Sequence, residues 1–266
     1  VRKDGTYTFE GLAANTTFDL LKRRTITEAK TVSPFIVEEQ EYVYRTSKYN
    51  AKEIAERFGS GSISFSGEGT IDEFAQNEDV MVQVNPDYNG YLVTLKRDID
   101  HGVALWDDMG AIHVQMAAHY INTDQYADEP GLRFEGASKY DSEFPTELTV
   151  MNTSLASDQL GRINGAWGRG WDKGVNPNYV GPDGEDGYAG IENKSKNPVF
   201  VTLEGGVVVT GGNGGNGAPR TNEVAGNGGK GGDAIVGLID LTLEGGWLVG
   251  GNGGNGASST FATGGN

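Results

Sequence analysis

The chain has 266 residues, of which 42 are glycine, 37 acidic and 21 basic, and its formal net charge is −16. It has no cysteine, which excludes disulfides, thiolate metal sites and cysteine nucleophiles. No run of roughly 18–20 apolar residues predicts a membrane span, and the negative charge argues against nucleic acid or anionic membranes as partners. More than half of the glycines follow residue 204, and most charges precede residue 198, which predicts a domain boundary near residues 194–198.

At the start of the chain, residues 7–20 read YTFEGLAANTTFDL. Leu12, Thr16 or Thr17, and Phe18 resemble the corner before the penultimate strand of a fibronectin type III sandwich. The resemblance implies that residues 1–35 are the end of such a sandwich, and hence that the chain was cut from a longer one. In the alternative interpretation, Phe18 is an ordinary core residue of a strand.

Residues 36–160 predict a β-rich spacer or attachment domain. A short helix is expected after Asn50, which serves as its N-cap, with Ile54 and Phe58 one turn apart and Gly59 as its stop. Alternating apolar residues predict strands over 62–66, 80–84, 91–96, 112–116, 132–135 and 147–151. The predicted fold class is therefore mostly β with minor α, ending in a glycine-rich bundle with short strands.

No motif of an enzyme is found, so no catalytic residue, cofactor or metal is expected. His101, His113 and His119 lack metal-ligand spacing, and structural or surface roles are favoured. The acidic clusters 107–108 and 124–129 have the chemistry to hold calcium or to act as paired carboxylates, but solvent-exposed loop charge is the favoured interpretation.

Residues 161–198 form a connecting segment rich in glycine and aromatic residues. Aromatic residues on such a loop-rich stretch could stack on sugars, as in glycan-binding sites, or form the packing seam between the middle domain and the repeat; we favour the seam. The aromatic residues concerned are Trp167, Trp171, Tyr179 and Tyr188.

Residues 199–266 form a repeat domain. Residues 201–218 read VTLEGGVVVTGGNGGNGA, and about 40 residues further on, 241–257 read LTLEGGWLVGGNGGNGA. Between them, 225–234 read AGNGGKGGDA. A second period of three appears inside each glycine tract. An extended left-handed helix with three residues per turn would place the polar residues on one edge and leave two bare glycine edges for neighbouring backbones.

Two other interpretations of the repeat fit the sequence less well. A flexible linker would lack the strands and the long period. A calcium roll would need tandem nonapeptides, whereas only residues 228–236 fit that motif, so calcium is weakly supported.

Strands that run into GGNGGN tracts resemble the polyglycine-sandwich domains of bacteriophage tail-fibre adhesins and tail-tip proteins. The resemblance implies a bundle of polyglycine II helices whose joining loops contact the bacterial surface, and a homotrimeric assembly. On this chain the receptor-binding loop residues would be Arg220, Thr221, Asn222, Glu223, Ser258, Ser259, Thr260 and Phe261.

The leading functional hypothesis is a phage tail-fibre or tail-tip protein located in the virion. Its partners would be a bacterial outer-surface receptor, protein or glycan, and other tail proteins. The alternative is a subunit of an extracellular filament or a surface adhesin. An enzyme that cleaves polysaccharide ranks third.

Overall fold

The protein is mostly β, with one helix among the residues that the structure describes, as the sequence predicts. The computed structural model describes residues 50–66, 74–85, 90–125, 127–136, 145–154, 159–170, 183–219 and 225–257, and four earlier strands. In those earlier strands, β1 (Leu21–Ile26) pairs antiparallel with β4 (Gln40–Arg45), and β2 (Thr31–Ser33) with β3 (Ile36–Val37). The residues that resemble a fibronectin corner lie outside the described part.

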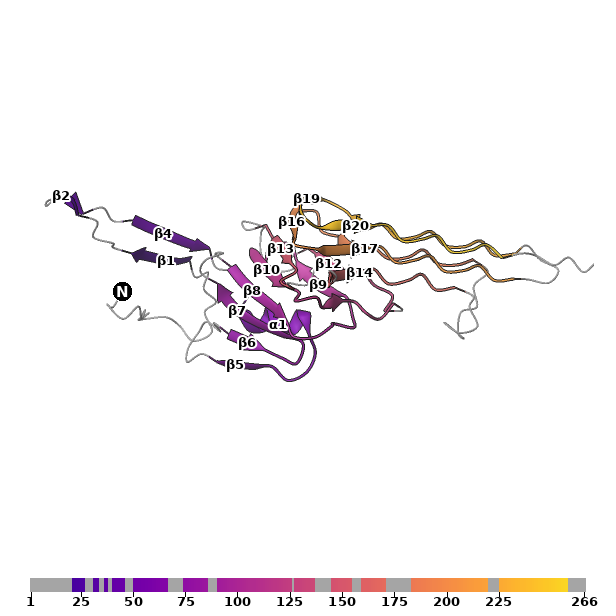
Figure 1. Ribbon diagram of the computed structural model, residues 1–266, viewed down its shortest axis with the longest axis horizontal. Helices are drawn as coiled ribbons and strands as arrows, with labels where there is room; N and C mark the ends of the chain where they lie inside the picture. Colours follow the sequence, from indigo (N-terminus) through magenta and orange to yellow (C-terminus); the bar gives the residue numbers. More distant parts are fainter. Residues whose placement is uncertain are drawn as a thin grey trace, which may run out of the picture.

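Three sheets of parallel strands form the centre of the molecule (Figure 1). The first holds β8 (Gly90–Leu95), β10 (Ala111–Gln115), β13 (Glu147–Met151), β16 (Val199–Glu204) and β19 (Ile239–Glu244). The second holds β11 (Tyr120–Ile121), β14 (Gly161–Asn164), β17 (Val207–Thr210) and β20 (Trp247–Val249). The third holds β9 (Val103–Trp106), β12 (Leu132–Glu135), β15 (Ile191–Asn193) and β18 (Ile235–Val236).

The chain passes through the three sheets in turn and then begins again, so each pass is one coil of a solenoid. The strands predicted at 132–135 and 147–151 have these bounds in the structure. The boundary expected near 194–198 falls between β15 and β16, which are successive strands of the solenoid.

Aliphatic side chains stack from coil to coil inside the solenoid. Parallel pairing places Ile112, Leu148, Val201 and Leu241 in one column of the first sheet, and the first three are at most 1% exposed. Since side chains alternate between the two faces of a strand, the pairing register sends one set inward in every coil. The core is thus a set of ladders in which each coil covers the one before it.

Helix α1 (Ala51–Phe58) and an antiparallel meander cover the first coil. The Glu53 N–H donates to Asn50 Oδ1 at 2.8 Å and the Asn50 N–H to Glu53 Oε2 at 3.0 Å, which makes a capping box. The helix buries Ile54 and Phe58 completely and contacts β6 (Phe74–Gln76), β7 (Val80–Asn85) and β9. β5 (Ser64–Ser66), β6 and β7 continue the first sheet antiparallel beside β8.

The side chain of Arg57 also links the helix to the solenoid. The Arg57 guanidinium lies 4.3 Å from the centre of the Trp106 ring and donates to the Ala104 carbonyl at 2.8 Å. The α1 helix is too short and too polar to cross a membrane, and no other helix occurs in the described ranges.

The last coil has no such cover within the described residues. Leu243 is 48% exposed, although its partner one coil earlier, Leu203, is 0% exposed. Trp247 in β20 is 53% exposed. Among the described residues, the solenoid is therefore covered at its first coil and uncovered at its last.

Leu203→Ala should cost about 2–5 kcal/mol of unfolding free energy, because it leaves a cavity among buried side chains. Leu243→Ala should cost less than about 1 kcal/mol, because a half-exposed leucine has less contact to lose. Urea unfolding monitored by circular dichroism measures both. Equal losses would show that Leu243 is covered in solution.

Candidate functional site

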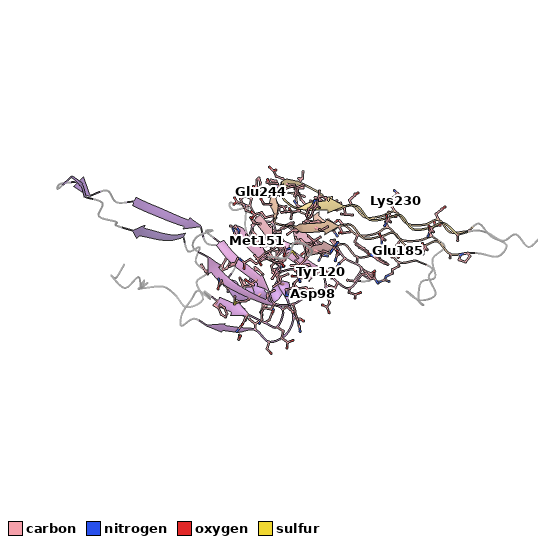
Figure 2. The ribbon with its side chains drawn as sticks, viewed as in Figure 1. Asp98, Tyr120, Met151, Glu185, Lys230 and Glu244 are labelled. Carbon is pink, nitrogen blue, oxygen red and sulfur yellow. The ribbon has the colours of Figure 1, made fainter. Side chains whose placement is uncertain are left out.

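Five glycine tracts leave the solenoid on one side and run next to one another (Figure 1). They lie in the connections between the second and third sheets, and we call them together the arm. The tracts are 165–170 after β14, 183–190 before β15, 211–219 after β17, 225–234 before β18 and 250–257 after β20. Figure 2 shows how few side chains they carry, with Glu185 and Lys230 labelled on two of them.

Backbone hydrogen bonds join the tracts with a repeat of three residues. The first glycines of successive triplets donate to the outgoing tract of the next coil, from Gly211, Gly214 and Gly217 to the carbonyls of Val249, Asn252 and Asn255, at 2.8–2.9 Å. The second glycines donate to the preceding returning tract, from Gly212 and Gly215 to the carbonyls of Tyr188 and Glu185, both at 2.8 Å. The described tracts contain no α-helix and no β-strand, so these bonds between tracts satisfy their buried amides.

Glycine is required at these positions because the backbones almost touch. A Cβ on Gly212 would lie 1.7 Å from the Ala166 oxygen, and one on Gly215 would lie 2.0 Å from the Arg169 oxygen. A Cβ on Gly214 would lie 2.2 Å from the oxygen of Gly229. No side chain fits between the tracts without moving them apart.

The third residue of each triplet has a role that sequence analysis missed. Asn213 Oδ1 accepts from the Asn252 N–H at 2.9 Å, and Asn216 Oδ1 accepts from the Asn255 N–H at 2.8 Å. On the other edge, Asp183 and Asp186 accept in the same way from the N–H groups of Asn227 and Lys230, both at 2.7 Å. The polar rows are thus ladders in which each side chain satisfies the backbone of the next coil.

A signal for these ladders exists in the sequence. Short side chains with an acceptor oxygen, Asn or Asp, recur three residues apart in tracts 183–190 and 211–219. These tracts supply the side-chain acceptors for the backbones of tracts 225–234 and 250–257. Their spacing alone does not reveal whether the oxygen faces water or a neighbouring amide.

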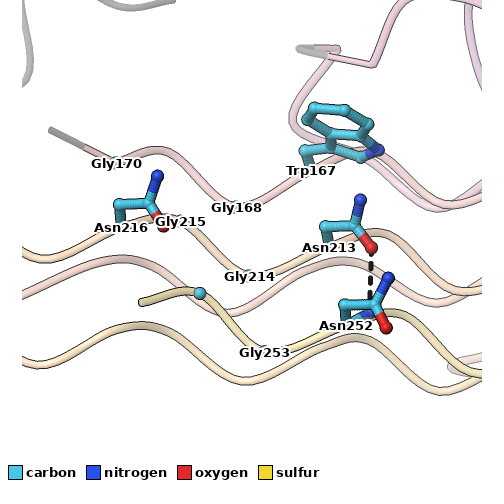
Figure 3. A pocket seen from close by; sticks show the side chains of 10 residues that line it. Trp167, Gly168, Gly170, Asn213, Gly214, Gly215, Asn216, Asn252 and Gly253 are labelled. Atoms are coloured by element: carbon cyan, nitrogen blue, oxygen red, sulfur yellow. Dashed lines mark hydrogen bonds between the residues drawn. The ribbon is translucent and has the colours of Figure 1, made fainter. Parts of the chain in front are cut away.

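Trp167 and three asparagines line a shallow groove of about 220 Å³ on one face of the arm (Figure 3). Trp167 is 38% exposed, and its backbone N–H donates to the Gln125 carbonyl at 2.7 Å. Asn213, Asn216 and Asn252 carry their amides on the same side of the tracts. An aromatic face beside several amides is the chemistry that recognises sugar rings and hydroxyl groups.

Of the predicted contact residues, Trp167 is the one that the structure describes. Both joining segments, with residues 220–223 and 258–261, lie outside the described part of the chain, as do Trp171 and Tyr179. Tyr188 lies on a returning tract, and it lines a second groove of about 340 Å³ with Asp186, Lys230 and Asp233.

Three carboxylates of the acidic clusters have structural partners, and these are Asp107, Asp128 and Glu129. Asp107 and Asp108 are 0% exposed, so the interpretation as solvent-exposed charge is wrong for them, and Asp107 accepts from Asn197 Nδ2 at 2.7 Å. Asp128 pairs with Arg169 of the first tract, at 2.7 Å from its Nε, and Glu129 accepts from the Gly102 N–H at 2.8 Å. No group of three potential metal ligands occurs in the described residues.

The histidines are dispersed over the solenoid. His101 pairs with Asp100 at 3.0 Å and His119 with Asp98 at 3.1 Å. His113 lies on β10, and burial lowers its pKa. Comparisons with protein-family models, curated proteins and solved structures give no match for this chain.

Gly215→Ala should open the arm, because its Cβ would lie 2.0 Å from a carbonyl oxygen, whereas Gly250 has nothing within 4 Å of the same position. Gly250→Ala should leave stability unchanged or raise it by about 0.4–1 kcal/mol, through the reduced freedom of the unfolded chain. Hydrogen exchange at the Gly229 amide measures the opening. Equal exchange in both variants would contradict the close packing.

Asn213→Ala should speed exchange of the Asn252 amide by about five- to ten-fold, since it removes an acceptor that contributes about 1 kcal/mol. Asn213→Asp keeps an acceptor oxygen and should preserve the protection. The Asn255 amide, which donates to Asn216, is the internal control and should not change in either variant.

Proposed function

We propose that this chain is an attachment protein of a phage tail fibre or tail tip, and that its arm carries the contact with the bacterial surface. The observation that carries the proposal is the arm itself, a set of tracts held together backbone to backbone and anchored on a solenoid. The three-residue repeat of its hydrogen bonds and its bare glycine edges support the interpretation as polyglycine II helices.

The arm is suited to present short segments at a distance from the body of the protein. Free glycine tracts would lose about 1–2 kcal/mol of backbone entropy per ordered residue. Anchoring on rigid strands supplies much of that order in advance. The segments that join outgoing to returning tracts, 220–223 and 258–261, are therefore the proposed receptor contacts.

A glycan is the ligand that the described face of the arm fits best. Trp167 offers a ring for stacking, and the asparagine amides offer both donors and acceptors. The favoured partner is thus a bacterial surface glycan, with a surface protein as the alternative.

A non-catalytic role is supported by the state of the carboxylates. The carboxylates of Asp107, Asp128 and Glu129 are held by Asn197, Arg169 and the Gly102 N–H, as expected of groups that stabilise loops. An enzyme acting on polysaccharide remains the third-ranked hypothesis.

The open end of the solenoid favours assembly, and with it the second candidate function, a subunit of an extracellular filament or surface adhesin. Leu238, Leu243 and Trp247 are 59%, 48% and 53% exposed at the last coil. Exposed apolar side chains on an open sheet edge are features of surfaces that pair with another chain. Copies of this chain in a trimer, or other tail proteins, would cover the same surface in the phage proposal.

The proposal is tested by binding of the fluorescently labelled protein to candidate bacterial cells. Exchanging residues 220–224 for glycine should abolish binding if the joining segment makes the receptor contact. Unchanged binding would refute that assignment. If the purified protein polymerises by itself and does not bind cells, the filament is favoured.

The glycan groove is tested separately by Trp167→Ala. Loss of a stacked ring should weaken binding by roughly 1–2 kcal/mol, or about five- to thirty-fold. Phe200→Ala is the matched control, since Phe200 is 39% exposed but lies on the first sheet, away from the arm. Equal effects of both substitutions would contradict a specific role for Trp167.

A further inference from the structure

The two sides of the arm differ in whether they are covered. On the side of the first tract, residues 122–125 and 127–130 lie against the backbone: the Ala166 N–H donates to the Glu129 carbonyl at 3.1 Å and the Trp167 N–H to the Gln125 carbonyl at 2.7 Å. The ion pair between Asp128 and Arg169 holds the same contact. On the other side, Gly251 and Gly254 of tract 250–257 donate to the carbonyls of Gly232 and Gly229 in tract 225–234 at 2.8 and 2.7 Å, and the described residues contain no tract beyond these two.

Glycines occur in tract 250–257 at positions where the described residues give no steric reason for them. A Cβ on Gly250 would meet nothing within 4 Å, and on Gly253 its nearest neighbour would be 3.7 Å away. The equivalent glycines one coil earlier, Gly211 and Gly214, would place a Cβ 2.0 and 2.2 Å from carbonyl oxygens of the returning tract 225–234. Glycine at Gly250 and Gly253 is thus explained if a further returning tract lies against them.

Unused backbone groups mark the same surface. In tract 183–190, Gly184 and Gly187 donate to the carbonyls of Asn227 and Lys230 at 2.8 Å. The equivalent N–H groups in tract 225–234 belong to Gly228 and Gly231. The equivalence follows from their neighbours, because a Cβ on any of these four glycines would meet a carbonyl oxygen of the outgoing tract that comes next in the chain. Neither N–H has a partner in the described residues.

The backbone carbonyls of the two outgoing tracts differ in the same way. The carbonyls of Gly212 and Gly215 accept from the N–H groups of Gly232 and Gly229 in the returning tract at 2.7 and 2.8 Å. The equivalent carbonyls in the last tract, those of Gly251 and Gly254, accept no hydrogen bond from the described part of the chain. Donors on one tract and acceptors on the other therefore face the same space.

We propose that the space between tracts 225–234 and 250–257 binds a sixth tract of Gly-Gly-X repeats, antiparallel to tract 250–257. Its carbonyls would accept from Gly228 and Gly231, and its N–H groups would donate to Gly251 and Gly254. Glycine is required at one of every three of its positions, because a Cβ there would meet a backbone oxygen of tract 225–234, as the equivalent Cβ atoms on Gly229 and Gly232 would meet oxygens of tract 183–190 at 1.9 and 2.2 Å. The partner is thus defined by its backbone and by its lack of side chains.

The surface continues onto the open end of the solenoid. The exposed strands β19 and β20 directly precede tract 250–257, and Leu243 and Trp247 are uncovered there. A partner that supplied a whole coil would cover both regions at once, whereas a glycan would match neither the spacing of the amides nor the glycines.

The test adds a peptide that copies residues 225–234, AGNGGKGGDA, to the full chain labelled with ¹⁵N-glycine. Saturating peptide should slow hydrogen exchange at Gly228 and Gly231 at least about ten-fold, the effect of one hydrogen bond at the upper end of its usual range. Gly229, whose amide is already bonded to the Gly215 carbonyl, should not change. A peptide with alanine at its second, fifth and eighth positions should have no effect.

Gly253→Ala gives the matched variant, because its methyl group would lie in the proposed site and would not clash with any described residue, the nearest atom being the Gly229 oxygen at 3.7 Å. It should weaken peptide binding at least about ten-fold while the thermal midpoint stays unchanged. Asn213→Asp, on the outer face, should bind the peptide normally.

Protection of Gly228 and Gly231 without added peptide would also support the site if Gly253→Ala removes it. A dependence on protein concentration would then identify the occupant as a tract of a second copy, and independence would identify a segment of the same chain. Fast exchange at both amides with and without peptide would overturn the proposal. So would peptide binding that Gly253→Ala leaves unchanged.

Discussion

Hydrogen bonds between the backbones of glycine tracts are the interaction on which this molecule depends. Each tract donates to the outgoing tract of the next coil or to a returning tract, so no tract is satisfied by itself. A net contribution of about 1 kcal/mol per hydrogen bond is close to the free energy lost when one residue is ordered. The order of a tract without the solenoid would therefore have little or no net stability. The arm is ordered because the solenoid fixes both where each tract starts and the direction in which it leaves.

The solenoid and the arm therefore share one register. Stacking of Ile112, Leu148 and Val201 sets the height of each coil, and the same spacing brings Asn213 within 2.9 Å of the amide of Asn252. A shift of one coil against the next would break the aliphatic columns and the asparagine ladder together. This coupling explains how a segment with almost no side chains takes a defined place in the structure.

Local features of the fold could be predicted from sequence, and its overall plan could not. Asn50 and Gly59 mark the ends of α1 because capping is a local interaction. The strands over 132–135 and 147–151 follow from alternation within a few residues. By contrast, the strands of the first sheet begin at residues 90, 111, 147, 199 and 239, with uneven spacing, so only the last two coils are recognisable as a repeat.

The candidate site divides in the same way. Glycine at two of three positions indicates close backbones, which the structure has, and Trp167 was picked out by its glycine-rich surroundings. The ladders formed by Asn213 and Asp183 were missed, because whether a side-chain oxygen meets water or an amide depends on the coil beside it. Burial of Asp107 was missed for a similar reason, since its partner Asn197 is 90 residues away in the chain.

The three-residue repeat of the arm also restricts how such a protein can change over generations. Loss of a single residue from tract 211–219 would turn every later glycine away from its neighbour and replace a ladder asparagine by a bare position. Insertions and deletions can be accepted only in whole triplets, and only when the outgoing and returning tracts of the same coil change together. Lineages should therefore differ in the length of the glycine tracts by discrete steps of a whole triplet.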